Sequence, residues 1–321
     1  MTIKVSKPAI NIREELADLK QDTGIKGQEL MRADTAQEVR SLIGAGRKNL
    51  IINGGFDVWQ RGTSFSSVAT GYTADRMRHA NYSGATPTIT KVGGTGNFLN
   101  AMKITGISTG QIEFEQRIES IGFPQSGNLT LSFWARGSKT GTIRSGRIIN
   151  ASTGATNTGC TTQDITTSWQ KFSVTVTAIG ATSSQYYRLF IGDSMLSYFD
   201  SSSVWLEITG VQLEVGSVAT DFEHRSYGEE LALCQRYYQT FQVSIEDYAS
   251  GGGQYQNASI VYPVEMRTTP SKNYTGGTSS NSSIGVLFYN TTNKGCRCEI
   301  YSNGSGRFFL LGVNTTHDAE L

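Results

Sequence analysis

Two closely spaced glutamates, Glu113 and Glu115, have a spacing that could serve the hydrolysis of a glycosidic bond. Glu113 and Glu115 are two residues apart, so both carboxylates fall on one face of a strand, and glycoside cleavage uses such a pair. The strand alternates polar and apolar residues, which places both glutamates on a solvated face. No Gly-x-Ser-x-Gly elbow precedes a helix, and His79 and His224 are interpreted as surface or turn residues. We expect no enzymatic activity.

Phosphate and zinc sites lack the residues that they need. Residues 93–96 are rich in glycine, but no Lys-Ser/Thr pair and no helix follow, which indicates a turn. Cys296 and Cys298 would need further ligands to hold zinc, and the three histidines have no suitable spacing to them. Four scattered cysteines do not make a disulfide framework.

Aromatic residues on predicted strands could instead bind a sugar. A pyranose ring stacks on an exposed aromatic face, while amide, carboxylate or arginine groups bind its hydroxyls. Burial in the sandwich or in a subunit interface is the alternative for each tryptophan. Tyrosine and asparagine abundance in the last 80 residues is typical of adaptable recognition surfaces. The candidate contacts are Trp134, Arg136, Trp205, Tyr255 and Tyr274.

The composition favours a β protein and excludes several partners. Of 321 residues, 37% are hydrophobic and 17% charged, a profile that suits short strands joined by many turns. The net charge is +1 without a basic run, so we expect no nucleic-acid binding. No stretch approaches the ~18 apolar residues of a membrane helix, and the N-terminus lacks a signal-peptide core. We expect synthesis in a cytoplasm and no membrane insertion.

Sustained helical periodicity is confined to residues 11–43. One apolar stripe contains Ile12, Leu16 and Leu19, and a second lies within residues 34–43, before a Gly-Ala-Gly stop. Such short amphipathic helices cannot bury their stripes alone. We predict that residues 1–46 form a helical attachment or oligomerisation segment; packing on its own domain is the alternative.

From residue 49 onward, alternation with a period of two indicates strands. Residues 112–119 and 129–136 alternate apolar and polar side chains, and residues 186–191 are apolar on both faces, as in a central strand or a subunit contact. In residues 204–215 the alternation slips by one at Gly210, as it does at a β-bulge. Residues 47–225 are therefore predicted to form a jelly-roll β-sandwich.

The remaining residues predict a short helix and a second β unit. Leu231, Cys234 and Tyr238 share one face of a connector helix over residues 229–238. The strand-like segments that follow are residues 258–266, 284–289, 298–301 and 307–313. We predict a mainly β fold in which residues 226–321 form the connector and a smaller C-terminal β-sandwich, too thin to be stable without packing on the first domain or on its copies.

Residues 49–65, NLIINGGFDVWQRGTSF, are interpreted as the opening corner of the jelly roll. The pattern predicts a strand over residues 50–52, after which the double glycine permits a tight turn. Phe56 and Trp59 are expected to close the end of the sandwich, and Asp57 to anchor a turn or an ion.

Four segments resemble, in order, the strands of jelly-roll carbohydrate-binding modules. They are residues 49–56 (NLIINGGF), 129–136 (LTLSFWAR), 168–172 (SWQKF) and 205–213 (WLEITGVQL). In that family the opening segment and a late acidic strand often hold a structural calcium ion. The resemblance implies Asp57 and Glu207 as its ligands, and no other cofactor is expected.

More specifically, residues 49–65, YTADRM at 72–77, residues 210–238 and YPVEMRTTPS at 262–271 are similar to tail-fibre and tail-tip proteins of tailed bacteriophages. The upstream residues 33–46 resemble the helical linker that often precedes such domains. The resemblance implies a virion protein, usually a homotrimer, that attaches to other tail proteins at its N-terminal end and meets the host surface near its C-terminal end.

These observations lead to a non-catalytic tail-fibre or receptor-binding protein that recognises host-surface polysaccharide by multivalent contacts. The alternative is a structural hub, collar or fibre-connector component that binds no glycan. A depolymerase is disfavoured because the sequence has no β-helix repeat.

Overall fold

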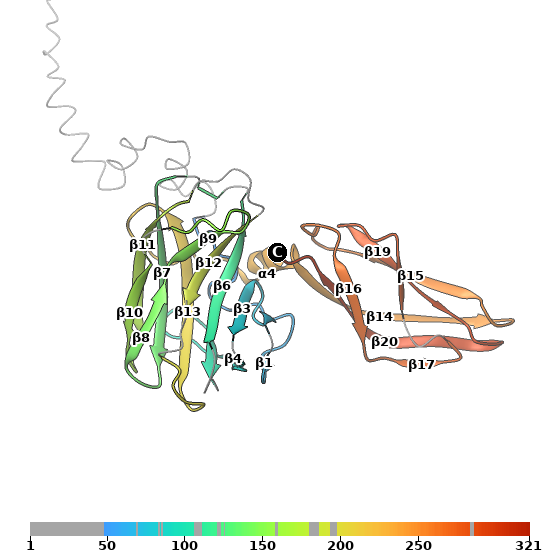
Figure 1. Ribbon diagram of the computed structural model, residues 1–321. Helices are drawn as coiled ribbons and strands as arrows, with labels where there is room; N and C mark the ends of the chain where they lie inside the picture. The colour runs from blue at the N-terminus through green and yellow to red at the C-terminus, as the bar shows by residue number, and fades with distance from the viewer. Residues whose placement is uncertain are drawn as a thin grey trace, which may run out of the picture.

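The computed structural model describes residues 48–321 except 69, 83, 85, 106–110, 121–122, 125, 158–159, 180–185, 193–197 and 283–285. The predicted N-terminal helical segment, residues 1–46, lies outside the described residues. The described chain is mainly β, as predicted, and forms two lobes side by side with one helix between them (Figure 1). No described helix is both long and apolar enough to cross a membrane.

The larger lobe, which we call the first sandwich, contains two antiparallel sheets. One has the strand order β1-β4-β5-β13-β7-β11 and the other β2-β3-β6-β12-β9, with β10 and β8 pairing separately. The strands are β1 (Ser64–Phe65), β2 (Gly71–Tyr72), β3 (Met77–Tyr82), β4 (Thr88–Gly93), β5 (Asn100–Thr105), β6 (Gln111–Glu119), β7 (Asn128–Gly137), β8 (Gly141–Ser145), β9 (Arg147–Asn150), β10 (Thr161–Ile165), β11 (Gln170–Thr177), β12 (Tyr186–Gly192) and β13 (Trp205–Val215).

Alternation along the strands builds the core between the two sheets. Leu129, Leu131 and Phe133 of β7 are fully buried, as their pattern predicted. The predicted β-bulge in β13 is confirmed, because the pairing with β7 shifts between Thr209 and Gln212. Gly210 has a φ of +62° there, which a glycine adopts without strain.

The prediction that Glu113 and Glu115 lie on a solvated face of β6 is wrong. Glu113 is 7% exposed and Glu115 0%, because arginine side chains of neighbouring strands lie over them. Glu115 accepts hydrogen bonds from Arg78, Arg117 and Arg188. The interpretation of His79 as a surface or turn residue is also wrong. It lies in β3 and is 1% exposed.

Residues 49–59 form a corner, and the predicted strand at residues 50–52 is wrong. The Leu50 amide donates to the carbonyl of Leu213 in β13 at 2.9 Å, but the pairing does not continue. Side-chain amides bind the next two residues: the Asn49 side chain accepts from the Ile51 amide at 2.9 Å, and Gln116 bonds both the N–H and the carbonyl of Ile52 at 2.8 and 2.7 Å. Phe56 and Trp59 do enter the core, as expected, with exposed fractions of 0% and 9%.

Replacing Gly54 with alanine tests how closely this corner approaches β13. A Cβ atom on Gly54 would lie 2.0 Å from the backbone oxygen of Val211, so β13 or the corner must shift. We expect the free energy of unfolding to fall by about 1–3 kcal/mol. Urea denaturation measures it, with Gly71→Ala as the control because nothing lies within 4 Å of that position. Equal stability of the two variants would contradict this close approach.

Helix α4 (Tyr227–Gln235) leads to the smaller lobe, the second sandwich. Ser226 and Glu229 form a capping box at its start. The sheet order is β14-β20-β16, with β17 also on β20, and β15-β19-β18 in the second sheet. The strands are β14 (Tyr238–Ala249), β15 (Tyr255–Val261), β16 (Ser271–Thr275), β17 (Thr278–Ser280), β18 (Leu287–Tyr289), β19 (Gly295–Tyr301) and β20 (Gly306–Asp318).

Two details of this lobe differ from the sequence prediction. Tyr238 begins β14 and does not lie on the helix, whose last residue is Gln235. The strand predicted over residues 258–266 ends at Val261, and β14 was not predicted. Its inner residues Val243 and Ile245 belong to a core separate from that of the first sandwich.

A buried histidine lies in the second sandwich. His317 is 0% exposed. Its Nδ1 lies 2.7 Å from the Tyr262 hydroxyl and its Nε2 3.1 Å from the Thr315 hydroxyl. Burial, helped by the charge of Lys272, lowers the pKa of His317 to about 4. The folded chain therefore holds this imidazole neutral.

Acid is expected to destabilise the second sandwich through His317. Its pKa rises from about 4 in the folded chain to the ordinary 6.5 in the unfolded chain. Its stabilising contribution is thus full above pH 6.5 and is lost as the pH falls toward 4, by about 3 kcal/mol in total. Circular dichroism of urea unfolding at pH 7, 5.5 and 4.5 measures it. His317→Gln should flatten the slope and His224→Gln should not; equal slopes in all three proteins would refute the assignment.

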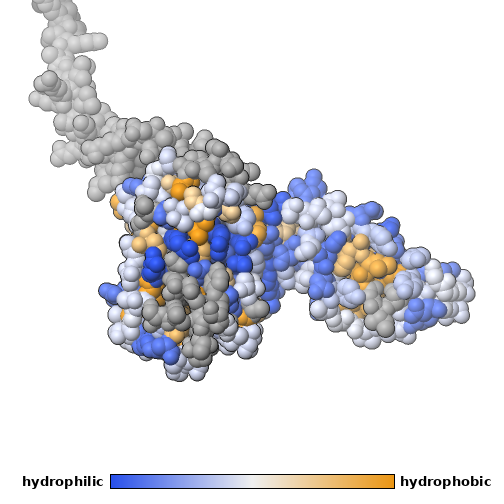
Figure 2. Space-filling model, viewed as in Figure 1, coloured by the Kyte–Doolittle hydropathy of each residue, from blue (hydrophilic) through white to orange (hydrophobic). Residues whose placement is uncertain are grey.

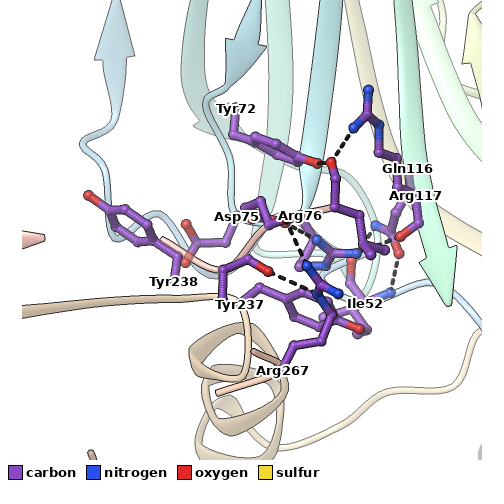
Figure 3. Close-up of polar contacts among 12 residues, drawn as sticks. Ile52, Tyr72, Asp75, Arg76, Gln116, Arg117, Tyr237, Tyr238 and Arg267 are labelled. Atoms are coloured by element: carbon purple, nitrogen blue, oxygen red, sulfur yellow. Dashed lines mark hydrogen bonds and ion pairs between the residues drawn. The ribbon is translucent and has the colours of Figure 1, made fainter. Parts of the chain in front are cut away.

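The end of the described chain returns to the first sandwich and ties the lobes together, beside Tyr72, Arg76 and Tyr237, which Figure 3 shows close to one another. After β20, the Ala319 amide donates to the carbonyl of Tyr237 at 2.8 Å. Glu320 accepts from Arg61 and Arg76, and the Tyr72 hydroxyl donates to the carbonyl of Leu321 at 3.2 Å. We call this region the junction. On the face shown in Figure 2, strongly hydrophilic residues gather over the first sandwich and beside the junction.

Candidate functional site

A hollow of about 360 Å³ lies on the outer face of the six-stranded sheet. Its walls come from the turn between β4 and β5, from β7 and β11, from the bulge of β13 and from the segment after β13. We call it the groove. The described residues that line it are Thr95, Gly96, Asn97, Phe98, Ser132, Trp134, Lys171, Gly210, Asp221, Phe222 and His224.

The β-bulge lets an aromatic cluster form one wall of the groove. A Cβ atom at Gly210 would lie 2.5 Å from the Phe98 ring, so only glycine leaves room for that ring over the strand. Phe98 meets Phe222 edge to face at a centroid distance of 4.9 Å, and the imidazole of His224 lies 5.4 Å from it. Both geometries are favourable for aromatic pairs.

Trp134 stands on the strand face that forms the floor. It pairs in register with Lys171 of β11 and Thr209 of β13, so all three side chains share the outer face. Trp134 is half-buried. The Lys171 ammonium donates to the carbonyl of Thr220 at 3.1 Å, which holds it at the rim. The groove thus combines indole and phenyl faces with polar groups at its edges.

A second aromatic group continues along the same sheet face. The Arg136 guanidinium lies 5.1 Å from the ring of Trp169 and 5.7 Å from that of Trp205. Its Nε donates to Glu207 at 2.7 Å, and Lys103 lies 4.5 Å from the Trp205 ring. Arg136 follows Trp134 by two residues, so this group adjoins the groove.

The structure brings three of the five predicted contacts to one face and separates the other two. Trp134, Arg136 and Trp205 share the outer face of the six-stranded sheet. Tyr255, 62% exposed, lies in β15 with its ring 5.9 Å from that of Tyr301, while Tyr274 lies in β16 of the other sheet. The sequence did not identify Phe98, Phe222, His224 and Lys171 as neighbours of Trp134, or Trp169 as a neighbour of Arg136, because no spacing in the sequence signals them.

The two predicted calcium ligands have other partners. Asp57 accepts from the Asn100 amide at 2.6 Å. Glu207 faces Arg136 at 2.7 Å and Lys103 at 3.8 Å, and two cations beside a carboxylate do not fit a further positive ion. Within the described part of the chain, no group of three or more His, Cys, Asp or Glu side chains could hold a metal ion. Calcium binding stays a prediction of the resemblance.

Comparisons with solved structures found similar chains at low identity. TmCBM61, solved with β-1,4-galactotriose, is 13% identical over 53% of this chain and 100% of its own, with a TM-score of 0.35. The family 11 carbohydrate-binding module of a Clostridium thermocellum cellulosomal cellulase is 11% identical over 49% and 97%, with a TM-score of 0.30.

A third similar structure is the enzymatically active domain of tailspike protein 4 from bacteriophage CBA120. It is 14% identical over 52% of this chain and 21% of its own, with a TM-score of 0.31. No protein-family model matches the sequence, and a search of curated proteins found no match. At these identities the likeness concerns the fold alone.

Proposed function

We propose that this chain binds a glycan in the groove, without turnover, as the receptor-binding part of a phage tail. The observation that carries the proposal is the juxtaposition of Trp134 with the cluster of Phe98, Phe222 and His224 around one hollow. An aromatic floor beside an aromatic wall offers faces on which the apolar side of a sugar ring can stack.

Polar groups at the rim support recognition of hydroxyls. Asn97, Ser132 and Asp221 line the groove beside the aromatic walls, and Lys171 is held at its edge. These supply amide, hydroxyl, carboxylate and ammonium groups beside the aromatic faces, and such groups can orient a bound sugar. The adjoining Trp169, Trp205 and Arg136 give an extended chain a further surface.

The proposed absence of turnover is supported by the location of the carboxylate pair, which lies away from the groove. Glu113 and Glu115 belong to the other sheet, and each is bound by arginine. A single groove of this kind binds weakly, so several copies on one virion would supply avidity through effective concentration. The phage role itself rests on the sequence resemblance.

Replacing Trp134 with alanine tests the groove. We expect glycan affinity to fall about 30-fold, because a central aromatic contact is worth about 2 kcal/mol. A glycan array identifies the ligand for the wild-type chain, and titration calorimetry compares the variants. Tyr248→Ala is the control, since that side chain is 75% exposed in the second sandwich. Wild-type affinity in Trp134→Ala would overturn the assignment of the groove.

Adsorption tests the phage role separately. Fluorescently labelled full chain should adsorb to host cells and Trp134→Ala should adsorb less. Release of reducing ends from host polysaccharide would contradict the absence of turnover. A folded chain that binds neither cells nor any glycan would favour the structural hub or connector role.

A further inference from the structure

The outer face of the three-stranded sheet in the second sandwich carries exposed aromatic side chains. β15 and β18 both pair with β19, and alternate residues of these strands point away from the core. Cys298 and Ile300 of β19 are fully buried, so their neighbours on the strand belong to the outer face. We call this surface the tyrosine face. It contains Tyr255 of β15, Leu287 and Tyr289 of β18, and Arg297, Glu299 and Tyr301 of β19.

Aromatic rings lie at two separate places on the tyrosine face. Tyr255, which is 62% exposed, pairs in register with Tyr301, and their ring centroids are 5.9 Å apart. Tyr289, which is 41% exposed, pairs with Arg297, four residues before Tyr301 on β19. Because a strand rises about 3.3 Å per residue, the two aromatic groups lie about 13 Å apart along the sheet. A ligand that contacts both groups must therefore be an extended molecule.

A polar pair lies between the two aromatic groups. One terminal nitrogen of Arg297 is 3.1 Å from a Glu299 carboxylate oxygen, and the guanidinium carbon is 5.3 Å from the centroid of the Tyr289 ring. The Arg297 side chain is 40% exposed, and its second terminal nitrogen forms no hydrogen bond with the described residues. That nitrogen carries N–H donors for a further oxygen atom.

The central ion pair favours a glycan over a second copy of this chain as the occupant. Charged residues are depleted at the core of protein–protein interfaces, and a protein surface laid over Arg297 and Glu299 would remove both charges from water at a cost. A sugar chain presents apolar C–H faces that stack on aromatic rings and hydroxyls that accept hydrogen bonds from an arginine. Rings at both ends of a polar centre match that alternation.

We propose that the tyrosine face binds a linear glycan and is a second site, separate from the groove. The glycan lies along β19, with one sugar on Tyr255 and Tyr301, another on Tyr289, and a hydroxyl between them that accepts from Arg297. This site goes beyond the proposed function, because the groove belongs to the first sandwich. A polysaccharide long enough to reach both sites would bind the chain more tightly than either site alone does, through effective concentration.

The test uses the full chain with Trp134→Ala as background, so that the groove does not contribute. An array of linear oligosaccharides, probed with this labelled chain, should show binding that increases from disaccharides to hexasaccharides, because only the longer chains reach both aromatic groups. Titration calorimetry with the hexasaccharide that binds best should show a loss of affinity of at least tenfold on adding Tyr289→Ala or Tyr255→Ala. Tyr289→Phe should keep the affinity, because the ring remains.

Tyr248→Ala in the same background is the matched control, because Tyr248 is an exposed tyrosine of β14, in the other sheet of the second sandwich. It should bind as the Trp134→Ala chain does, and circular dichroism checks that each variant folds. No binding of any array oligosaccharide by the Trp134→Ala chain, or equal affinities of the Tyr289→Ala and Tyr248→Ala variants, would overturn the proposal.

Sedimentation velocity tests the alternative occupant. A wild-type chain that self-associates, together with a Tyr255→Ala variant that does not, would identify the tyrosine face as a subunit contact and would overturn the proposal. The two glycan sites fail separately. Wild-type affinity in Trp134→Ala would overturn the groove and leave the tyrosine face, whereas a Trp134→Ala chain that binds no oligosaccharide would overturn the tyrosine face and leave the groove.

Discussion

Replacing Glu115 with glutamine is expected to lower the free energy of unfolding of the first sandwich by about 3–5 kcal/mol. The carboxylate is 0% exposed. One oxygen accepts from Arg78 at 2.9 Å and Arg117 at 3.1 Å, and the other from Arg188 at 2.6 Å. The amide removes the negative charge that three guanidinium groups share, so they repel one another across a partly buried face.

Tryptophan fluorescence during urea denaturation measures this loss selectively. All four tryptophans, Trp59, Trp134, Trp169 and Trp205, belong to the first sandwich. The control is Asp200→Asn, which makes the same chemical change in an exposed pair with Lys139 and should leave the midpoint unchanged. If Glu115→Gln unfolded at the same urea concentration as this control, the carboxylate would not organise the arginine face.

Replacing Glu320 with glutamine is expected to uncouple the two lobes as well as to destabilise the chain, by about 3–5 kcal/mol. Its side chain is 5% exposed and accepts from Arg76, itself 1% exposed, and from Arg61 at 3.3 Å. Arg61 retains Asp75 as a partner, but Arg76 is left with no carboxylate. A buried unpaired charge at the junction should separate the lobes before either unfolds.

Differential scanning calorimetry gives the readout. The wild type should show one transition and Glu320→Gln two, with the tryptophan signal following only one of them. Glu265→Gln is the control, because Glu265 pairs with Lys294 on the exposed surface of the second sandwich. A single transition at the wild-type temperature in Glu320→Gln would show that the lobes do not depend on this contact.

Much of the first sandwich could be predicted because alternation is a local property. The inward set of β7 and the slip at Gly210 follow from neighbouring residues alone. Alternation names the face of a side chain but not what covers that face. Arg78, Arg147 and Arg188 are far apart in the sequence. Only the antiparallel pairing of β3 and β12 with β6, and of β9 with β12, gathers them over Glu113 and Glu115.

Alternation also predicts the part of the groove and its surroundings that lies on strands, but not the part that lies on loops. Trp134, Arg136 and Trp205 share a face because they alternate with core residues on paired strands. Phe98 and Phe222 come from segments outside the strands, whose path depends on the bulge and not on any periodicity. The exposure of the alternating glutamates and the conformation of Ile52 could not be predicted, because side chains distant in sequence bind them: Arg78 binds Glu115 and Gln116 binds Ile52.

The return of residues 319–321 to the junction has a practical geometric consequence. Any polypeptide joined after Leu321 leaves the molecule at the junction, close to Tyr72 and Tyr237. The turns at residues 250–254 and 302–305 lie instead at the far end of the second sandwich, where β14 ends and β20 begins (Figure 1). A fluorophore or affinity tag placed in those turns would lie on the outermost surface of the second sandwich. One fused after Leu321 would lie against the junction between the lobes.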